Sequence, residues 1–206
     1  MDKNKLKFNI LKSKQLYDGF CKVFNITFNH QKFNGSTSNV KEHEIFVRSP
    51  CVGVLPYNPI TNEVILIKQF RIGAIDPLNQ FKANFNPWLL EIVAGIIDTN
   101  ESFEQTGIRE CQEEAGCNIT KLIPMHDYLV SPGANNERIK LFCGIFTEKY
   151  IPGIFGLDFE NEDIKTYLMS LDKAEDLLNS GKICNAASIV ALQWIIINKK
   201  KILDLQ

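Results

Sequence analysis

Three glutamates near the middle of the chain have the type and spacing needed to hold a metal ion. Glu110, Glu113 and Glu114 stand at positions i, i+3 and i+4, so on an α-helix their carboxylates emerge on one side. Carboxylates so close together repel one another at neutral pH, and a hard divalent cation with oxygen ligands relieves that repulsion. The same pattern, taken alone, also suits a solvated acidic helix face. A divalent-metal site and a plain acidic surface are therefore the two interpretations to separate.

The residues around these glutamates predict a loop that leads into a helix. Gly95 and the turn formers at 98–100 come first, and Gly116 suits the left-handed conformation that closes a helix. Arg109 supplies one positive charge beside the carboxylates. A second helical stripe is apolar, and we expect it to pack on the core while the glutamates face outward. This stripe consists of Ile108, Cys111 and Ala115.

The chain has the size and composition of an ordinary globular protein. Its 206 residues are 45% hydrophobic, which is enough for one domain with a substantial core. The 23 basic and 24 acidic residues give a net charge of −1, so no overall charge attracts nucleic acid or an anionic membrane. We therefore expect a small-molecule partner, with no nucleic acid and no membrane.

The cysteines and the N-terminus favour a cytoplasmic protein with reduced thiols. The six cysteines include no CxxC pair, and the first residues lack the apolar run of a signal peptide. The three histidines form no cluster with the spacing of zinc ligands. No apolar stretch reaches the roughly 18 residues of a membrane span.

The segment from Gly95 to Cys117 resembles the Nudix box, the signature of Nudix hydrolases. The resemblance covers 23 residues and includes Gly95, Glu101 and the run RECQEEAGC that begins at Arg109. Every fixed Gly, Glu and Arg position of the box is met. Cys111 and Cys117 stand where the family usually has aliphatic residues, a mild departure because a free cysteine packs as a small hydrophobe.

Periodicity and turn residues predict short strands before and after this helix, and two helices at the end. The expected elements are an exposed lead-in over 1–14, a strand near 20–28, a turn at Asn34-Gly35, an extended segment through 45–47, a hairpin of 51–57 and 63–70, a loop over 72–87, a buried strand over 88–94, strands over 122–130, 139–146 and 164–169, and helices over 172–180 and 186–200. This order indicates a mixed α/β layered fold.

The Nudix resemblance sharpens the expected fold to an α/β/α sandwich around a mixed sheet, with a small N-terminal β-sheet region. It divides the chain into an N-terminal strand region over 1–48 and a Nudix hydrolase domain over 49–206. Family members exchange such N-terminal strands across a homodimer. The resemblance therefore implies a homodimer in which the strand region makes the dimer contact.

Three features outside the box resemble the ADP-ribose pyrophosphatase branch of the family. They are Pro132 in Ser131-Pro132-Gly133, the acidic segment ENEDI at 160–164, and GKICNAASIVALQW at 181–194. With LYDGF near Leu16 and WLLEIVAG from Trp88, the similarity spans nearly the whole chain. It implies Mg²⁺-dependent hydrolysis of ADP-ribose to AMP and ribose 5-phosphate.

The resemblance also assigns metal ligands and a catalytic base. Glu110 and Glu114 are the principal ligands of Mg²⁺, for which Mn²⁺ is an alternative, and Glu113 and the backbone carbonyl of Ala94 complete the shell. Arg109 orients the box carboxylates through bidentate pairing. The base that deprotonates the attacking water lies on the acidic loop. It is Glu160 first and Glu162 second, and Glu162 is alternatively a further metal ligand.

Other positions match residues that contact the substrate in the family. Arg71 matches a contact to the diphosphate, for which its planar fork is suited. Glu91 and Glu137 match positions that line the site, where they meet ribose hydroxyls or metal.

Two positions depart from the family pattern in the region that recognises the base. Cys21 stands where relatives carry an aromatic residue, and His43 stands where they carry a second arginine. Phe46 or Phe20 is left to supply the stacking contact. Base specificity is therefore less firmly indicated than the reaction.

Two other functions remain as alternatives. The first keeps the reaction and changes the substrate to GDP-mannose or another nucleoside diphosphate sugar. The second is a non-catalytic sensor that binds ADP-ribose, although degenerate sensors generally lose box carboxylates. This chain keeps them all, namely Glu101, Glu110, Glu113 and Glu114.

Overall fold

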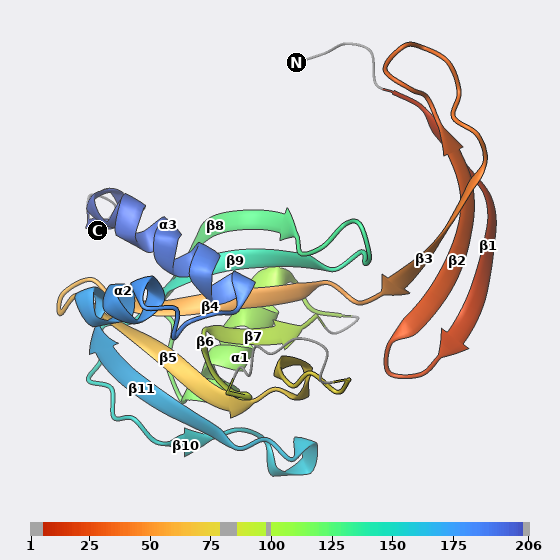
Figure 1. Ribbon diagram of the computed structural model, residues 1–206. Helices are drawn as coiled ribbons and strands as arrows, with labels where there is room; N and C mark the ends of the chain where they lie inside the picture. Colours follow the sequence, from red (N-terminus) through yellow and green to blue (C-terminus); the bar gives the residue numbers. More distant parts are fainter. Residues whose placement is uncertain (1–5, 79–85, 98–99, 204–206) are drawn as a thin grey trace. The chain divides into compact units, whose positions relative to one another are not determined.

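The computed structural model describes residues 6–78, 86–97 and 100–203 (Figure 1). The described chain separates into two compact units. One consists of Met1–Ser49 with Leu129–Arg138, and the other of Pro50–Tyr128 with Ile139–Gln206. The start of the expected lead-in (1–5), part of the expected loop (79–85) and the turn formers at 98–99 lie outside the described residues.

The smaller unit is built on a three-stranded antiparallel sheet in the order β1-β2-β3. Its strands are β1 (Phe8–Asp18), β2 (Lys22–His30) and β3 (Lys41–Val47). The expectation of an irregular lead-in over 1–14 is wrong for residues 8–14, which belong to β1. Every residue of β1 is solvent-exposed, so no buried side chains mark it as a strand. Backbone pairing with β2 holds it instead.

The expected turn at Asn34-Gly35 is confirmed in the connection between β2 and β3. Gly35 adopts a φ of 85°, a conformation that favours glycine. The side-chain oxygen of Asn34 accepts a hydrogen bond from the Ser36 N–H over 3.1 Å. This local hydrogen bond is the Asx type that makes Asn a turn former.

The larger unit contains an eight-stranded sheet with the path β10-β11-β5-β4-β9-β8, to which β6 adds at β5 and β7 at β4. β4 and β9 run parallel, whereas β4 pairs with β5 and β7 in antiparallel fashion, so the sheet is mixed. The strands are β4 (Cys51–Asn58), β5 (Glu63–Phe70), β6 (Trp88–Glu91), β7 (Val93–Ile96), β8 (Lys121–Leu129), β9 (Arg138–Ile145), β10 (Ile154–Phe155) and β11 (Ile164–Ser170).

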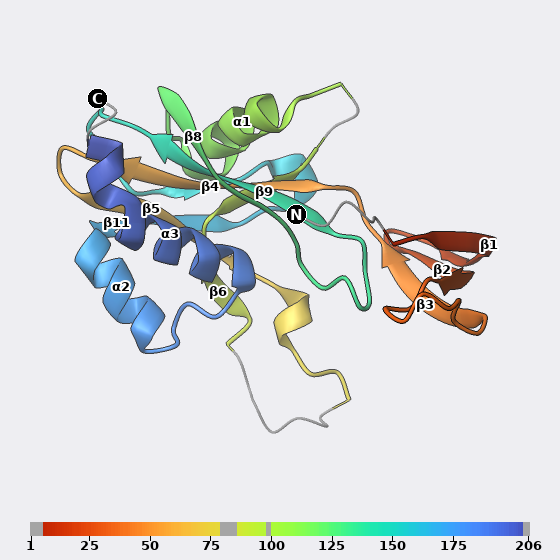
Figure 2. The same cartoon turned by 90° about the horizontal axis from the view of Figure 1, so that it is seen from above.

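Helices cover both faces of this sheet (Figure 2). α1 (Phe103–Ala115) packs on one face, and α2 (Leu171–Asn179) and α3 (Ala186–Leu203) pack on the other. Alternate residues of β5 separate the two cores, since Leu66 packs with α2 and α3 whereas Ile65 and Ile67 pack with α1. The expected α/β/α sandwich around a mixed sheet, with a small additional β-sheet, is confirmed.

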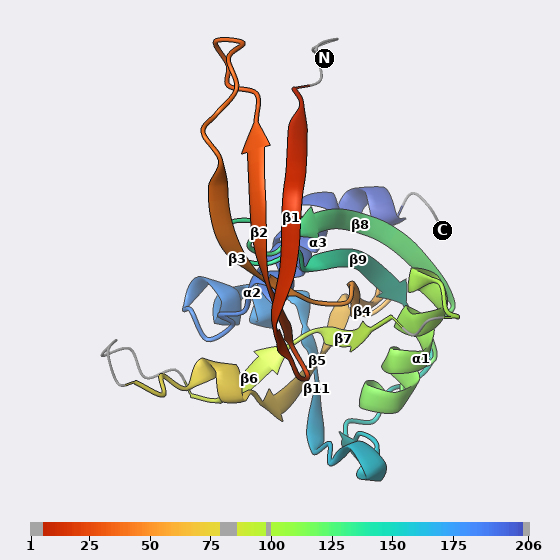
Figure 3. The same ribbon diagram turned by 90° about the vertical axis from the view of Figure 1, so that its right-hand side faces the viewer.

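The single buried strand expected over 88–94 is instead two strands. β6 pairs with β5 and β7 pairs with β4, and the buried Ile92 lies at the change of partner. The N–H of Ile92 donates to the hydroxyl of Ser188 on α3 over 2.9 Å, which satisfies the backbone where pairing stops. Trp88 at the start of β6 is 54% exposed. The change of partner brings β7 beside α1 (Figure 3).

The remaining expected elements are present with small shifts at their ends. The expected loop at 72–87 begins with the short 3₁₀ helix Ile72–Ala74, and the loop before β11 contains β10 and the 3₁₀ helix Asp158–Glu160. Within the described residues, no helix has both the length and the apolar character needed to cross a membrane.

Candidate active site on helix α1

Local sequence signals fix both ends of α1. Ser102 is the N-cap, and its hydroxyl accepts from the Gln105 N–H while the Gln105 side chain accepts from the Ser102 N–H, which is a capping box. Gly116 closes the helix with a φ of 58°. The left-handed closure at Gly116 confirms the sequence prediction.

The face that α1 buries differs from the predicted one at Ile108. Cys111 and Ala115 are fully buried, as expected, but Ile108 is 46% exposed. Gly107 is buried instead, and a Cβ at this position would lie 3.0 Å from Val54 on β4. The absence of a side chain at Gly107 lets the helix approach β4 closely. The helix therefore presents its face around Gly107 to the sheet and turns Ile108 to solvent.

Arg109 joins three of the acidic residues on and before α1. Its Nε lies 3.1 Å from Glu101 Oε1, and its Nη1 lies 2.7 Å from Glu113 Oε2 and 2.9 Å from Glu110 Oε1. The hydrogen bond from Arg109 holds the pKa of Glu101 below its usual range, and a hydrogen bond from Thr106 adds to this effect. The guanidinium fork thus sets the orientation of the carboxylates around it.

Thr106 is a residue of this cluster that sequence reasoning did not identify. It is fully buried, and its hydroxyl donates to Glu101 Oε2 over 2.8 Å. A threonine in the first turn of a helix carries no signal of this contact, because Glu101 lies before the helix begins.

Glu110 and Glu114 lie together in a buried environment. Glu114 is 3% exposed, so the expectation that all three box carboxylates face outward is wrong for this residue. Its Oε2 accepts a hydrogen bond from the Ala94 N–H over 3.1 Å. Burial raises the pKa of Glu114 to about 8, and the charges of Glu110 and Glu162 add to the rise. Burial likewise raises the pKa of Glu110 to about 7.

Gly95 leaves the space that the Glu110 side chain occupies. A Cβ built on Gly95 would overlap the Glu110 carboxylate group. β7 therefore carries two consecutive residues that touch the cluster, the Ala94 backbone and Gly95. The glycine at this position of the box has a direct steric reason.

The acidic loop brings Glu162 toward these carboxylates. Glu162 is partly buried, its Oε2 accepts from the Leu157 N–H over 3.1 Å, and its charge contributes to the raised pKa values of Glu110 and Glu114. Glu160 is exposed at the end of the 3₁₀ helix Asp158–Glu160. The two base candidates thus occupy different environments, one beside the cluster and one open to solvent.

Arg71 and Glu91 form a close ion pair in the same unit. Arg71 Nε lies 2.7 Å from Glu91 Oε2, and Glu91 is buried whereas the Arg71 side chain is 43% exposed. The charge of Arg71 also lowers the pKa of Glu114, against the effect of burial. Arg71 therefore lies within electrostatic range of the carboxylate cluster and remains accessible to a ligand.

The other predicted substrate contacts belong to the smaller unit. His43 packs edge-on against Phe28 with ring centroids 5.6 Å apart, and Phe46 is 51% exposed. Glu137 lies 3.6 Å from Arg48. The part of His43, Phe46 and Glu137 in substrate binding stays a prediction.

The donor set around α1 fits a hard divalent cation. Among the residues that the structure describes, no three His, Cys, Asp or Glu side chains converge as a ready-made metal site. Arg109 and the Ala94 N–H instead hold the carboxylates. Glu114 is buried and its neighbour Glu110 is partly buried; both have raised pKa values and only oxygen donors, and such a pair is stabilised by the charge of a bound cation.

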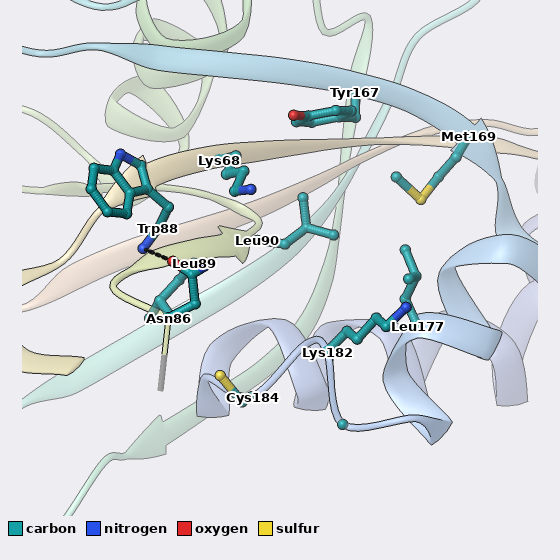
Figure 4. A pocket seen from close by; sticks show the side chains of 11 residues that line it. Lys68, Asn86, Trp88, Leu89, Leu90, Tyr167, Met169, Leu177, Lys182 and Cys184 are labelled. Carbon is teal, nitrogen blue, oxygen red and sulfur yellow. Dashed lines mark hydrogen bonds between the residues drawn. The ribbon is translucent and has the colours of Figure 1, made fainter. Parts of the chain in front are cut away.

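A cavity of about 550 Å³ lies on the other side of the sheet (Figure 4). Leu90, Met169 and Leu177 line it, and these residues pack with the α2 and α3 core rather than with α1. Lys68 and Trp88 also face this cavity. It contains none of the box residues and is separate from the carboxylate cluster.

Comparison with known proteins relates the whole arrangement to one family. Residues 47–188 match the model of the NUDIX domain. The chain is 40% identical to an ADP-ribose pyrophosphatase of Escherichia coli (strain K12), in an alignment that covers 90% of this chain and 86% of the relative. It is 36% identical to an ADP-ribose pyrophosphatase of Haemophilus influenzae, with coverage of 92% and 86%.

Two more distant similarities carry other substrate names. A GDP-mannose pyrophosphatase of Enterobacter sp. is 28% identical, with coverage of 92% of this chain and 95% of the relative. A crystal structure of an ADP compounds hydrolase superimposes with a TM-score of 0.71 at 19% identity, over 97% of this chain and 98% of that one. This last similarity supports the fold alone.

Proposed function

Because this chain belongs to the NUDIX domain family, we propose that it hydrolyses the pyrophosphate bond of ADP-ribose, giving AMP and ribose 5-phosphate. The observation that carries the reaction is the pair of Glu110 and the buried Glu114 beside β7, with Arg109 on one side and the accessible Arg71 within electrostatic range. The 40% identity to a protein named ADP-ribose pyrophosphatase favours this substrate.

GDP-mannose is the second candidate substrate. A protein named GDP-mannose pyrophosphatase is 28% identical over nearly the same length, so it is a more distant relative. Cys21 and His43, which depart from the pattern expected for adenine recognition, are the residues that favour this alternative. The NAAS sequence at the start of α3 favours ADP-ribose.

Glu110, Glu114, Glu113 and the Ala94 carbonyl would hold Mg²⁺, or Mn²⁺ in its place. When bound, such a cation neutralises charge on the phosphate oxygens and lowers the pKa of water. Glu110 and Glu114 lose protons to accept the cation, since the pKa values of both are raised without it. Arg109 keeps the carboxylates oriented through its contacts to Glu110 and Glu113.

Arg71 is suited to bind the diphosphate of the substrate. Its guanidinium fork can donate two parallel hydrogen bonds to phosphate oxygens. Glu91 fixes one side of the fork through the 2.7 Å contact to Nε and leaves the terminal nitrogens for a ligand. Glu91 therefore positions Arg71, and a ribose hydroxyl is its second candidate partner.

The two acidic loop residues would divide the remaining roles between them. Glu162 lies beside Glu110 and Glu114 and already accepts the Leu157 N–H, so it is suited to add a further oxygen ligand to the metal site. Glu160 is exposed and keeps its carboxylate available to take a proton from water, which supports it as the base.

Two substitutions separate these roles. Glu160→Gln should lower kcat and leave the affinity for Mn²⁺ unchanged, whereas Glu162→Gln should weaken Mn²⁺ binding measured by isothermal titration calorimetry. If Glu162→Gln kept wild-type Mn²⁺ affinity and lost the acidic limb of the pH–rate profile, where the rate rises as the base loses its proton, the assignments would have to be exchanged.

The smaller unit is proposed to form the contact of a homodimer. The apolar side chains of β1, among them Phe8, Ile10 and Leu16, are exposed on the chain alone. A second copy would cover such a surface. None of the six cysteines is in a disulfide, which suits a reducing compartment, and we place the enzyme in the cytoplasm. A monomeric mass by light scattering at micromolar concentration would rule out the dimer.

The first experiment is a measurement of AMP release from ADP-ribose by the purified protein with Mg²⁺, with EDTA as control and GDP-mannose and other nucleotide sugars alongside. We expect metal-dependent AMP release that is fastest with ADP-ribose. Faster cleavage of GDP-mannose would replace the substrate and keep the reaction. No turnover of any substrate by folded protein would favour the non-catalytic sensor.

A further inference from the structure

Two donors from outside α1 bond to carbonyl oxygens of its last turn. α1 ends at the left-handed Gly116, and the last carbonyl oxygens of a helix have no N–H partner within it. The Gly156 N–H donates to the Glu113 carbonyl oxygen over 3.2 Å. The Tyr150 hydroxyl donates to the Ala115 carbonyl oxygen over 2.7 Å. The segment before β11 is thus bonded to the backbone of the helix that carries the box carboxylates.

Phe155 packs directly on the end of the helix. A Cβ at Gly116 would overlap the Phe155 ring, so the ring lies against the glycine where a side chain would otherwise stand. Phe155 pairs with Ile164 of β11 in the sheet, and it is partly buried, whereas its neighbour Ile154 is 73% exposed. The two residues of β10 therefore have different environments, and Phe155 is the one whose side chain lies on Gly116.

Gly156 allows the loop after β10 to fold back on Glu162. Gly156 has a φ of 111°, and a Cβ at this position would lie 2.6 Å from the Glu162 Cβ. The Leu157 N–H donates to the Glu162 carboxylate over 3.1 Å, and the Glu162 N–H donates to the Leu157 carbonyl oxygen over 3.3 Å. The loop is closed on itself next to the point where it meets α1.

We propose that Phe155 and Gly156 are positioning residues, which dock the loop of residues 156–162 on the end of α1 and so hold Glu162 beside Glu110 and Glu114. The proposal rests on the hydrolase function proposed above and adds two residues outside the box to its machinery. Because the docking contacts reach the backbone and cap of α1, the loop cannot shift relative to the helical carboxylates without breaking them.

The matched pair Phe155→Ala and Ile154→Ala tests this proposal. Hydrogen exchange of the metal-free protein measures the docking directly, as protection of the loop amides. Phe155→Ala should lose protection at the amides of Gly156 and Glu162, whereas Ile154→Ala should keep it. In the ADP-ribose assay, Phe155→Ala should lower kcat about 100-fold, the scale expected for a misplacement of about 1 Å. KM should stay near the wild-type value, because neither residue touches the diphosphate contact at Arg71.

Two further variants keep the test decisive. Gly156→Ala disturbs the same docking from the loop side and should reproduce the loss of protection at Glu162. Phe155→Leu keeps an apolar side chain on Gly116 and should recover part of kcat. This variant also tests the docking if Phe155→Ala does not fold. Wild-type protection and a kcat within about threefold of wild type in Phe155→Ala and Gly156→Ala would overturn the proposal, as would an equal loss in Ile154→Ala. If the wild type hydrolyses no nucleotide sugar, the proposed function fails, and the exchange data still decide whether the loop is docked.

Discussion

Substitution of Gly95 by alanine should lower the activity much more than it lowers the stability of the fold. The added Cβ would occupy the space of the Glu110 carboxylate group. The overlapping atoms belong to the outer part of a side chain, which can swing away more easily than backbone. We therefore expect the protein to fold with Glu110 displaced from the position in which it meets Arg109 Nη1 at 2.9 Å.

The expected magnitudes of the two effects differ. Overpacking in a well-packed region costs about 1–3 kcal/mol of unfolding free energy, and the escape of the side chain favours the lower end of that range. For a chain of this size, 1 kcal/mol corresponds to a fall in Tm of about 2–4 °C. A displaced ligand carboxylate should lower kcat about 100-fold or more. Function should therefore fall much further than stability.

Three measurements on Gly95→Ala check this reasoning. They are Tm by calorimetry, Mn²⁺ affinity by titration calorimetry, and kcat for AMP release. Gly73→Ala is the control, since a Cβ at Gly73 would meet no atom within 4 Å. The steric explanation of Gly95 would be refuted by a variant that binds Mn²⁺ and turns over ADP-ribose as the wild type does.

Three other changes have defined outcomes. Glu114→Gln keeps an oxygen that accepts the Ala94 N–H, so it should change the unfolding free energy by less than about 1 kcal/mol. It should lower kcat by orders of magnitude, because a ligand carboxylate is lost. An unchanged rate would remove Glu114 from the metal site. Burial raises the pKa of Cys143 from 9.0 to about 12, so its contribution to stability is complete below about pH 9 and is lost as pH rises toward 12. Between pH 8 and 10 the wild type should lose about 1 kcal/mol more unfolding free energy than Cys143→Ala, and an equal loss in both proteins would contradict the shift. Ile108→Gln should change unfolding free energy by at most about 0.5 kcal/mol, because this residue is 46% exposed, and a loss above about 2 kcal/mol would show that it is a core residue.

The parts of the site that depend on local signals were predictable from the sequence. The helical spacing of Glu110, Glu113 and Glu114 and the left-handed closure at Gly116 follow from a few consecutive residues. The hairpin of β4 and β5 and the helices α2 and α3 were recognisable for the same reason. In each of these elements, turn chemistry and periodicity agree with the tertiary fold.

The elements that depend on distant partners were not predictable in the same way. β1 has no buried residue and is a strand only because β2 pairs with it. The break at Ile92 arises because β5 and β4 each take one half of the expected strand, and the hydroxyl of Ser188 on α3 satisfies the backbone between them. The pattern of apolar residues within 88–94 does not indicate that one half pairs with β5 and the other with β4.

The orientation of α1 on the sheet decides which residues of the box are buried. The sequence places Ile108 and Glu114 on different stripes of the helix, and apolar character alone assigns Ile108 to the core. Gly107 changes this outcome, because its lack of a side chain brings the helix onto Val54 through that face. Glu114 is then buried against β7 and Ile108 is exposed. A glycine inside a helix was the available signal, and its meaning depends on the strand that lies opposite.

The same dependence on a distant contact explains why the sequence does not distinguish Glu160 from Glu162. Both are glutamates of one short acidic segment, and their spacing carries no information about which one turns toward α1. Gly156 provides that information in the fold, since its positive φ folds the loop back so that Leu157 and Glu162 bond to each other. Glu162 is thereby held beside Glu110 and Glu114, where a bound cation would relieve the repulsion among the three carboxylates, while Glu160 keeps access to water. The division of roles that we propose for the two glutamates therefore depends on how the loop is docked.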